Sequence, residues 1–469
     1  MRLGVVLAAL LAGCAVGPNF ERPPAPSAAT YTAAPLPAGF VENQDIPGEW
    51  WTLFHSQPLN DLIERALRAN PDLRAAQAAL VAARENALAQ RGAFYPSVDA
   101  SVAVSHNKTS QQISPTPSSG ESIYSLYTPE LVVSYAPDVF GLTRRTVEAA
   151  DAQTAQQRFA LVATHLTLTS NVAVGAIQEA VLRAQIDATH ELIAINTDML
   201  QALEHQFVKG YVGRLDVAAQ QSQLAQVQAT LPPLLKRLAQ QRDLLTALSG
   251  SFPDDELPEQ FALASLELPS ELPVTLPSRL VEQRPDVREA EESLHAASAR
   301  VGIAVANRLP NFTLSADVGT MALTAATVFA GGAGFWTLAA SAAQPIFHGG
   351  TLLHDERAAR AELDQAAAQY QSTVVSACQN VADSLHAIQQ DGEALTAATA
   401  AKDAAAVTLK LSTNQFRAGY AGYLSVLNAE QTYQQAMLNL VQAQADRYSD
   451  TVALFQSLGG GWWNRTELN

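Results

Sequence analysis

The chain repeats one segment, and this repeat restricts what it can fold into. One copy begins at Asn70-Pro71-Asp72-Leu73 and the other at Arg284-Pro285-Asp286-Val287, and each runs on into an alanine-rich helical stretch. A second proline, Pro96 or Pro310, comes at the same spacing in both copies, and alternating apolar and polar residues begin there. Self-similarity of this kind indicates two related structural units in one chain.

The segments after the two copies also match each other. Residues 95–137 and 309–345 each contain two alternating runs around a connection, which is the pattern of a β-hairpin. Each hairpin precedes a long helical stretch, a glycine turn and a returning helix. We predict helices over residues 142–208, 214–248, 351–416 and 423–458, with turns at Gly210, Gly213, Gly419 and Gly422.

The repeat divides the chain into segments. A proline-rich, acidic connector separates the two copies. The expected organisation is a signal peptide over residues 1–13, a lipid-anchored extended segment over 14–57, a first structural repeat over 58–248, the connector over 249–277, a second repeat over 278–458 and a tail over 459–469.

The predicted helices are longer than a globular domain needs. A helix over residues 142–208 would measure roughly 100 Å. In the returning helix, apolar residues recur from Val217 to Leu248 at spacings of three and four, with Gln220 and Gln241 in two of these positions. A sustained pattern of this kind predicts a coiled-coil seam. Pro232-Pro233 should bend this helix. The first repeated helix should run from Pro71 to about Arg91, with Pro96 closing it.

The first residues indicate export. Met1-Arg2 and the apolar run from Leu3 to Leu11 are too short to span a bilayer and are typical of a secretory signal. Leu11-Ala12-Gly13-Cys14 resembles a bacterial lipobox, which would make Cys14 the lipidated first residue of the mature protein, with a diacylglycerol and an N-acyl chain. The alternative is an ordinary signal with a chance cysteine. In such lipoproteins, Ala15 after the cysteine implies sorting to the outer membrane.

The hairpins separate apolar from polar side chains. Alternate residues are apolar from Val98 to Val104 and from Phe312 to Val318, whereas Asp99, Glu130 and Asp317 lie on the opposite faces. A half-buried hairpin of a soluble domain shows the same alternation, so this pattern alone does not distinguish a membrane hairpin from a soluble one.

A membrane location would impose a further condition on these strands. Backbone groups in a bilayer must all be paired, so four strands can serve only if several chains close one barrel. Two, three or four chains would give about eight, twelve or sixteen strands, and this choice stays open. In such a barrel Asp99, Glu130 and Asp317 would face the lumen.

Composition and motifs argue against several classes of protein. The net charge of −16 disfavours a nucleic-acid-binding surface. Neither the nine histidines nor Cys14 and Cys378 show the spacing of metal ligands, and no phosphate-binding loop or nucleophile elbow is present. We therefore expect no enzyme activity, no metal and no cofactor apart from the lipid. Cys378 falls on an apolar helix stripe, where buried packing is expected.

The chain resembles the outer-membrane efflux lipoproteins of the TolC and OprM type, the exit ducts of tripartite pumps. The resemblance covers essentially the whole mature chain and depends on the order and spacing of several motifs: Cys14-Ala15-Val16-Gly17-Pro18-Asn19-Phe20-Glu21-Arg22-Pro23, Trp50-Trp51, the two repeated motifs and Leu458-Gly459-Gly460-Gly461-Trp462. It implies a TolC-like homotrimer with mixed α and transmembrane β structure. Four strands per chain would form a twelve-stranded outer-membrane β-barrel, continuous with a twelve-helix periplasmic α-barrel.

The resemblance also implies partners and a gate. The partners are a periplasmic adaptor protein, an inner-membrane pump, usually of the resistance-nodulation-division type, and outer-membrane lipid. In this family, helices of the second half close the resting channel at its periplasmic end. The matching gate candidates are Leu427, Asn428, Arg417, Tyr420 and Asp216.

Leu427 would form an apolar ring and Asn428 a neutral polar ring. Relatives often carry an aspartate where Asn428 stands, and this departure puts cation preference at the aperture in doubt. The alternative is that the candidate residues only cap and pack the helical hairpins.

The expected function is passive export of drugs or other small toxic solutes from periplasm to exterior, with the energy supplied by the pump. One alternative is an outer-membrane component of a type I-like protein secretion system. Another, from a different class, is a periplasmic coiled-coil scaffold.

Overall fold

The computed structural model describes residues 15–28, 30–33, 39–42, 44–110, 121–255, 257–269 and 271–466. Cys14 and the predicted signal peptide lie outside these described residues. Contacts divide the chain into two compact units. Unit 1 comprises residues 1–23, 79–157 and 290–370, and unit 2 comprises residues 24–78, 158–289 and 371–469. Each unit thus combines segments from both sequence repeats.

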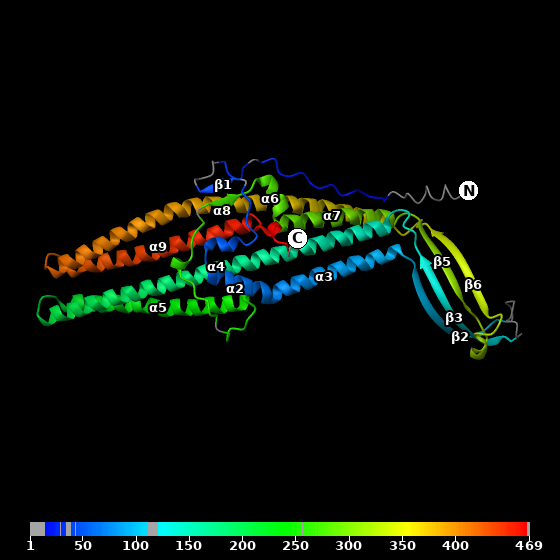
Figure 1. Cartoon of the computed structure of the whole chain (residues 1–469), viewed down its shortest axis with the longest axis horizontal. Helices are drawn as coiled ribbons and strands as arrows, with labels where there is room; N and C mark the ends of the chain where they lie inside the picture. Colours follow the sequence, from blue (N-terminus) through cyan, green and yellow to red (C-terminus); the bar gives the residue numbers. More distant parts are fainter. Residues whose placement is uncertain are drawn as a thin grey trace. The chain divides into compact units, whose positions relative to one another are not determined.

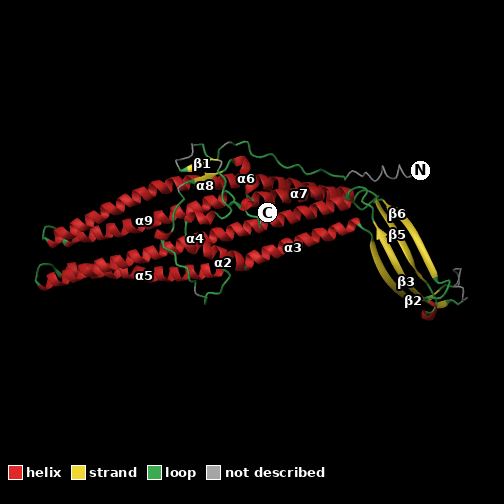
Figure 2. Cartoon of the chain, in the orientation of Figure 1, coloured by secondary structure: helices red, strands yellow, loops and turns green. Residues whose placement is uncertain are grey.

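Unit 1 contains a four-stranded antiparallel sheet, drawn in yellow in Figure 2. The strands hydrogen-bond in the order β2 (Ser97–Lys108), β3 (Ile123–Tyr135), β5 (Asn311–Thr320) and β6 (Gly334–Ala343). Each expected hairpin region contains one pair of strands, and β3 and β5 join the two pairs. The edges of the sheet are β2 and β6, and neither has a second strand partner among the described residues.

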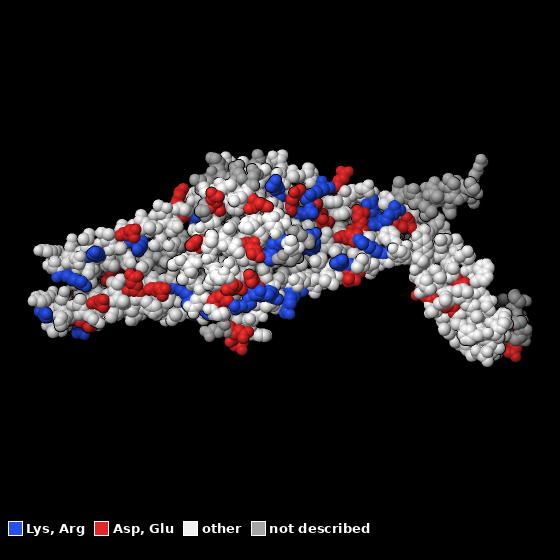
Figure 3. All heavy atoms as spheres, in the orientation of Figure 1, with Lys and Arg blue, Asp and Glu red and all other residues white. Residues whose placement is uncertain are grey.

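The pairing register places the alternating apolar residues of all four strands on one face. Val98 of β2 lies opposite Val133 of β3. Val318 of β5 lies between Leu131 of β3 and Trp336 of β6. Directly opposed residues share a face, and a slip of one residue would move a strand's apolar set to the other side. Trp336 is 77% exposed, and the part of the sheet visible in Figure 3 carries few charged atoms.

The opposite face of the sheet carries three carboxylates. Asp99 on β2 and Asp317 on β5 both lie opposite Val132 on β3. Glu130, two residues earlier on β3, points to the same side because strand side chains alternate. Ser101 Oγ donates a hydrogen bond of 3.2 Å to Glu130 Oε1. The three acidic residues therefore share the polar face across neighbouring strands.

Two antiparallel helix pairs supply most of unit 2 (Figure 1). The first pair is α4 (Leu142–Val208) with α5 (Arg214–Leu248), and the second is α8 (Thr351–Arg417) with α9 (Tyr423–Ser457). Along α5, the predicted seam is the least exposed line of residues, and Gln220 and Leu245 within it are fully buried. The observed α8 ends one residue later, and α9 one residue earlier, than the sequence pattern indicated.

The shorter elements precede each hairpin or join the long helices. They are β1 (Phe40–Glu42), the 3₁₀ turn η1 (Trp50–Phe54), α2 (Gln57–Ala69), α3 (Pro71–Arg91), η2 (Gly92–Phe94), η3 (Leu263–Ser265), β4 (Leu272–Val274), α6 (Pro277–Gln283), α7 (Pro285–Ala306), η4 (Ala325–Thr327) and η5 (Trp462–Asn464). In unit 2, β1 pairs in parallel with β4.

The repeated motif joins the start of one helix to the end of another. Asn70 caps α3, because its Oδ1 accepts from the Leu73 backbone N–H at 3.1 Å, and its Nδ2 donates to Leu248 O at 3.0 Å. Arg284 takes the equivalent place before α7 and donates to Ser457 O at 3.1 Å. Leu248 and Ser457 are the last residues of α5 and α9. The sequence repeat therefore encodes one junction that is built twice.

A glycine completes each junction. Gly250 and Gly459 adopt positive φ angles of 79° and 95°. A Cβ at Gly250 would lie 2.5 Å from Ala69 O, and one at Gly459 would lie 2.6 Å from Gln283 O. Only glycine fits both the left-handed conformation and this approach of two backbones.

The prolines have less effect on helix ends than expected. The first repeated helix, α3, ends at Arg91 as expected, but Pro96 does not end it directly, because a 3₁₀ turn over residues 92–94 lies between the helix and β2. Helix α5 continues through Pro232 and Pro233 without interruption, and the bend expected there stays a prediction. The carbonyls that lose their donors there belong to Gln228 and Ala229, which lie at exposed positions and face water instead.

We expect Trp50→Ala to destabilise unit 2 strongly. Trp50 is 1% exposed and stacks on Phe455 with ring centroids 5.4 Å apart, so truncation should leave a cavity and cost about 3–5 kcal/mol. Thermal unfolding in detergent, followed by circular dichroism, measures this loss. Phe252→Ala is the control, because Phe252 is 77% exposed. Equal melting temperatures for both variants would contradict the assignment of Trp50 to the core.

Candidate functional site

The two helix turns of unit 2 are built alike. Gly210 after α4 and Gly419 after α8 have φ angles of 76° and 79°. Tyr211 N donates to Gln206 O at 3.0 Å, and Tyr420 N donates to Gln415 O at 2.9 Å, which closes each helix end with a glycine cap. Gly213 and Gly422 are extended and precede α5 and α9 as N-caps.

The gate candidates differ in their surroundings. Tyr420 is 88% exposed, and Arg417 and Asn428 are also exposed in the single chain. Leu427 is half-buried and packs against a cluster formed by Met199, Leu203, Phe416, Tyr423 and Val426. Asp216 accepts a hydrogen bond of 3.1 Å from the Gly213 backbone N–H and so caps α5. This contact fits the capping role that the sequence left open for Asp216.

A cavity of about 840 Å³ lies between the two turns. Both hairpins of unit 2 line it, with Lys209 and Tyr211 from the first and Arg417 and Gly419 from the second. Basic, aromatic and backbone polar groups thus surround a space at the end of the helix pairs.

A buried polar layer lies close to this end and was not expected from the sequence. Gln220 of α5 is fully buried, and its Nε2 donates to Asn196 O at 2.9 Å and to Asn196 Oδ1 at 3.0 Å. The Tyr423 hydroxyl of α9 donates to Gln220 Oε1. Glu430, also on α9, is 1% exposed. The only sequence signal was that polar residues occupy positions on apolar helix stripes.

Burial raises the pKa of the Glu430 carboxyl to about 7, and the Gln220 amide opposes this rise in part. Burial, together with Glu430 and Asp216, also raises the pKa of the Tyr423 phenol. Among the described residues, neither oxygen of the Glu430 carboxyl has a hydrogen-bond partner. An ionised carboxylate is poorly stabilised at this position.

A second carboxyl with a raised pKa lies further along the second helix pair. Burial raises the pKa of Asp391 to about 7, with further increases from a hydrogen bond to Asp450 and from the charges of Asp450 and Asp446, and Arg447 opposes them. Arg447 itself donates to Ile388 O at 2.6 Å. The hydrogen bond between Asp391 and Asp450 connects α8 with α9.

Cys378 is less buried than its apolar stripe suggested. Its side chain is only half-buried on α8, and burial raises the pKa of the thiol despite the nearby Arg284. In the described part of the chain, no three His, Cys, Asp or Glu side chains are grouped so that they could hold a metal ion.

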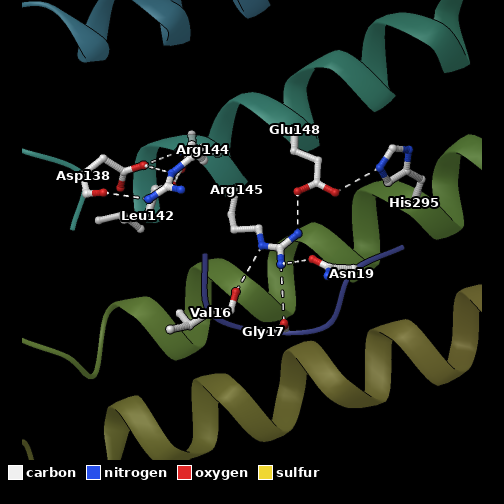
Figure 4. A network of polar contacts seen from close by, with 10 residues as sticks. Val16, Gly17, Asn19, Asp138, Leu142, Arg144, Arg145, Glu148 and His295 are labelled. Carbon is white, nitrogen blue, oxygen red and sulfur yellow. Dashed lines mark hydrogen bonds and ion pairs between the residues drawn. The ribbon is translucent and has the colours of Figure 1, made fainter. Parts of the chain in front are cut away.

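In unit 1, the N-terminal segment is held by a buried arginine (Figure 4). Arg145 of α4 is 3% exposed and donates from Nε to Val16 O at 3.1 Å. Its Nη2 donates to Gly17 O at 3.4 Å and to Asn19 Oδ1 at 2.8 Å. Its Nη1 pairs with Glu148 at 2.7 Å. Nε and both terminal nitrogens of the guanidinium therefore have acceptors. Two of these acceptors are the backbone carbonyls of Val16 and Gly17.

Contacts with α7 and with the start of α4 continue this docking. The Phe20 ring stacks on His295 with centroids 4.3 Å apart, and Arg22 pairs with Glu291 at 3.0 Å. Val16 N donates to Phe140 O at 3.1 Å. The residues that directly follow Cys14 thus lie against the loop between β3 and α4.

Comparison with known proteins identifies similar chains over nearly the full length. The model of a family described as outer membrane efflux protein matches residues 62–251 and 276–460. The toluene efflux pump outer membrane protein TtgC of Pseudomonas putida is 29% identical over 98% of this chain and 95% of its own length. The probable outer membrane lipoprotein SilC of Salmonella typhimurium is 27% identical over 97% of both chains.

A solved structure has the same fold. The outer-membrane channel OprN superposes with a TM-score of 0.90 at 26% identity, covering 96% of this chain and all of that one.

We expect Arg145→Ala to release the N-terminal segment. Losing hydrogen bonds from a charged donor, each of which contributes about 1.5–3 kcal/mol, should raise amide exchange at Val16 and its neighbours at least about tenfold. Hydrogen exchange followed by mass spectrometry measures this change. Arg91→Ala is the matched control, because the Arg91–Asp151 pair in the same unit is exposed. Unchanged exchange in Arg145→Ala would show that other contacts hold the segment.

Proposed function

Because the chain belongs to the outer membrane efflux protein family, we propose that it is the outer-membrane exit duct of a tripartite efflux pump. It passively conducts drugs or other small toxic solutes from the periplasm to the exterior. The names of relatives such as the toluene efflux protein TtgC support this substrate class.

The observation that carries the proposal is the register of the sheet. Four strands present one continuous apolar face, with Trp336 and Leu338 about three-quarters exposed, and one face with three carboxylates. A soluble sheet would cover such a surface with other elements of the chain. In a barrel wall the apolar face meets lipid, and Asp99, Glu130 and Asp317 line the water-filled lumen.

The free edges of the sheet support a homotrimer. A bilayer contains no water to pair the outer backbone groups of β2 and β6, so sister chains must pair with them. Three chains give about twelve strands, enough for a water-filled barrel. A coiled-coil scaffold in the periplasm would have no use for such paired hairpins.

The other end of the duct would meet the pump. We place the gate and the docking end at the helix turns, where Arg417 lines the cavity between the two hairpins and Tyr420 is 88% exposed. A periplasmic adaptor protein and an inner-membrane pump of the resistance-nodulation-division type are the proposed partners. Substrate selection and energy belong to the pump, and this chain catalyses no reaction.

The proposed anchor is a lipid on Cys14. Its nearest described neighbours, Ala15 and Val16, lie against the loop that follows β3, so acyl chains on Cys14 would enter the membrane beside the sheet. Two or more acyl chains are enough for stable attachment. The relative SilC, named as a probable lipoprotein, supports this assignment.

We expect Leu427→Ala/Asn428→Ala to widen the resting aperture. Removing an apolar ring and a polar ring together should raise single-channel conductance in planar bilayers several-fold. Leu424→Ala/Ser425→Ala is the control, since both residues lie at exposed positions on the same helix. An unchanged small conductance in the Leu427/Asn428 variant would contradict the gate assignment.

Cys14→Ser should abolish the lipid without abolishing the duct. Intact-mass spectrometry should show that the wild-type chain carries a diacylglycerol and an N-acyl group that the variant lacks. The barrel itself should still hold the variant in the membrane, since it buries far more apolar surface than a few acyl chains. If the wild-type mass equals that of the unmodified chain, the anchor proposal is wrong.

A further inference from the structure

Glu430 occupies an unusual position for a carboxyl group. It lies on α9, two residues after the gate candidate Asn428, and is 1% exposed. Among the described residues, neither Oε1 nor Oε2 accepts or donates a hydrogen bond. Buried polar atoms are almost always hydrogen-bonded, so an exception needs a physical reason.

The neighbouring polar groups stabilise its charge only in part, through the Gln220 amide. Gln220 is the polar side chain beside it, but both Nε2 hydrogens of Gln220 go to Asn196. The Gln220 oxygen accepts from Tyr423, whose hydroxyl proton is thereby used. The donors of this layer are therefore committed to one another and not to Glu430.

Apolar clusters lie on both sides of this polar layer. Towards the turns, the cluster contains Met199, Leu203, Phe416, Tyr423 and Val426. In the other direction, it contains Leu192, Val227, Ala405, Tyr433 and Ala436. Each cluster combines side chains of α4, α8 and α9. The Glu430 carboxyl thus lies in an interface that joins the two helix pairs.

In the part of the chain that the structure describes, no cation compensates Glu430 from any element of this interface. The titratable groups of this layer are Tyr423 and Tyr433 on its own helix, with Asp216 of α5 near Tyr423 and Glu191 of α4 hydrogen-bonded to Tyr433. Helix α8 contributes Phe416 and Ala405, which are apolar. Burial is therefore the cause that disfavours a negative charge on Glu430.

We propose that Glu430 is a proton-dependent latch between the two helix pairs: the neutral carboxyl allows α9 to pack against α4 and α5, and the ionised carboxylate weakens this packing. The inference depends on the proposed function, because the second helix pair closes the duct there. It assigns the control of that closure to a residue outside the aperture.

The direction of the pH effect is set by proton linkage. Burial raises the pKa of Glu430 to about 7 in the packed state, whereas an exposed glutamate has a pKa of about 4.3. The packed state therefore binds the proton more tightly. Its stabilisation is complete below the pKa of the exposed group and is lost as pH rises through about 7. The closed duct is favoured in acid, and opening is favoured near neutrality.

The test compares open probability in planar bilayers for wild type, Glu430→Gln and Glu430→Leu. Between about pH 5 and about pH 8, the wild-type ratio of open to closed channels should rise at least about tenfold. Both variants keep a neutral side chain at this position, so both should stay mostly closed, with a flat pH profile. Asp391→Asn is the matched control, because it removes another carboxyl whose pKa is raised to about 7, and it should retain the wild-type profile.

Each outcome decides something different. A pH profile in Glu430→Gln equal to that of wild type would overturn the latch. A flat pH profile in Asp391→Asn, together with a wild-type profile in Glu430→Gln, would assign the pH response to Asp391. This result would also overturn the latch at Glu430. Complete absence of channels from the wild-type protein would instead refute the proposed duct. Hydrogen exchange of residues 423–433 supplies a readout independent of conductance: protection should fall with rising pH in wild type, after correction for intrinsic exchange, but not in Glu430→Gln.

Discussion

Backbone hydrogen bonding at the two edges of the sheet is the constraint on which the rest of the molecule depends. β2 and β6 each have one paired side among the described residues, and a lipid environment offers no partner for the other side. Water would satisfy these groups, but water does not suit the face that carries Trp336 and Leu338. Pairing with further copies of the same chain resolves both requirements. In the proposed barrel, the apolar face then meets lipid, and the face with Asp99 and Asp317 encloses water.

In the proposed duct, the helix pairs address a different physical problem, which is how to close and open an aqueous path. Long seams give α4, α5, α8 and α9 a well-defined packing, and most of this packing is apolar. The layer of Asn196, Gln220 and Glu430 interrupts it close to the turns. A buried carboxyl without a partner weakens the interface when it ionises. If the duct needs only a slight preference for its closed state, a residue at this position does not have to stabilise that state.

Much of the fold could be predicted from the sequence, because its main signals are local and periodic. The range of α4 corresponds to helical sequence without a breaker that ends at a glycine turn, and the strand faces correspond to the alternation of apolar and polar residues. Proline was a less reliable local signal. A 3₁₀ turn separates the end of the first repeated helix at Arg91 from Pro96, and α5 continues through Pro232-Pro233 because the freed carbonyls face solvent.

The candidate site was less predictable, because it depends on contacts between residues far apart in the chain. Gln220 could be assigned to a seam, but its contact with Tyr423 spans 203 positions. Arg145 reaches Val16 over 129 positions, and no periodicity in either segment indicates that pairing. The sequence assigned Leu427 and Asn428 to the gate only through the family resemblance. The unusual environment of Glu430 could be recognised only from the structure, which shows that its side chain is buried.

Closure of the sheet by sister chains is tested most directly by disulfide cross-linking in the outer membrane. Single cysteines at successive positions of β2 and β6 would be combined in a Cys378→Ala background, which removes the thiol on α8. Closure by sister chains predicts that some pairs form covalent ladders ending at three chains. If every pair leaves only single chains, or links β2 to β6 within one chain, the sheet does not close in this way and the central claim is wrong.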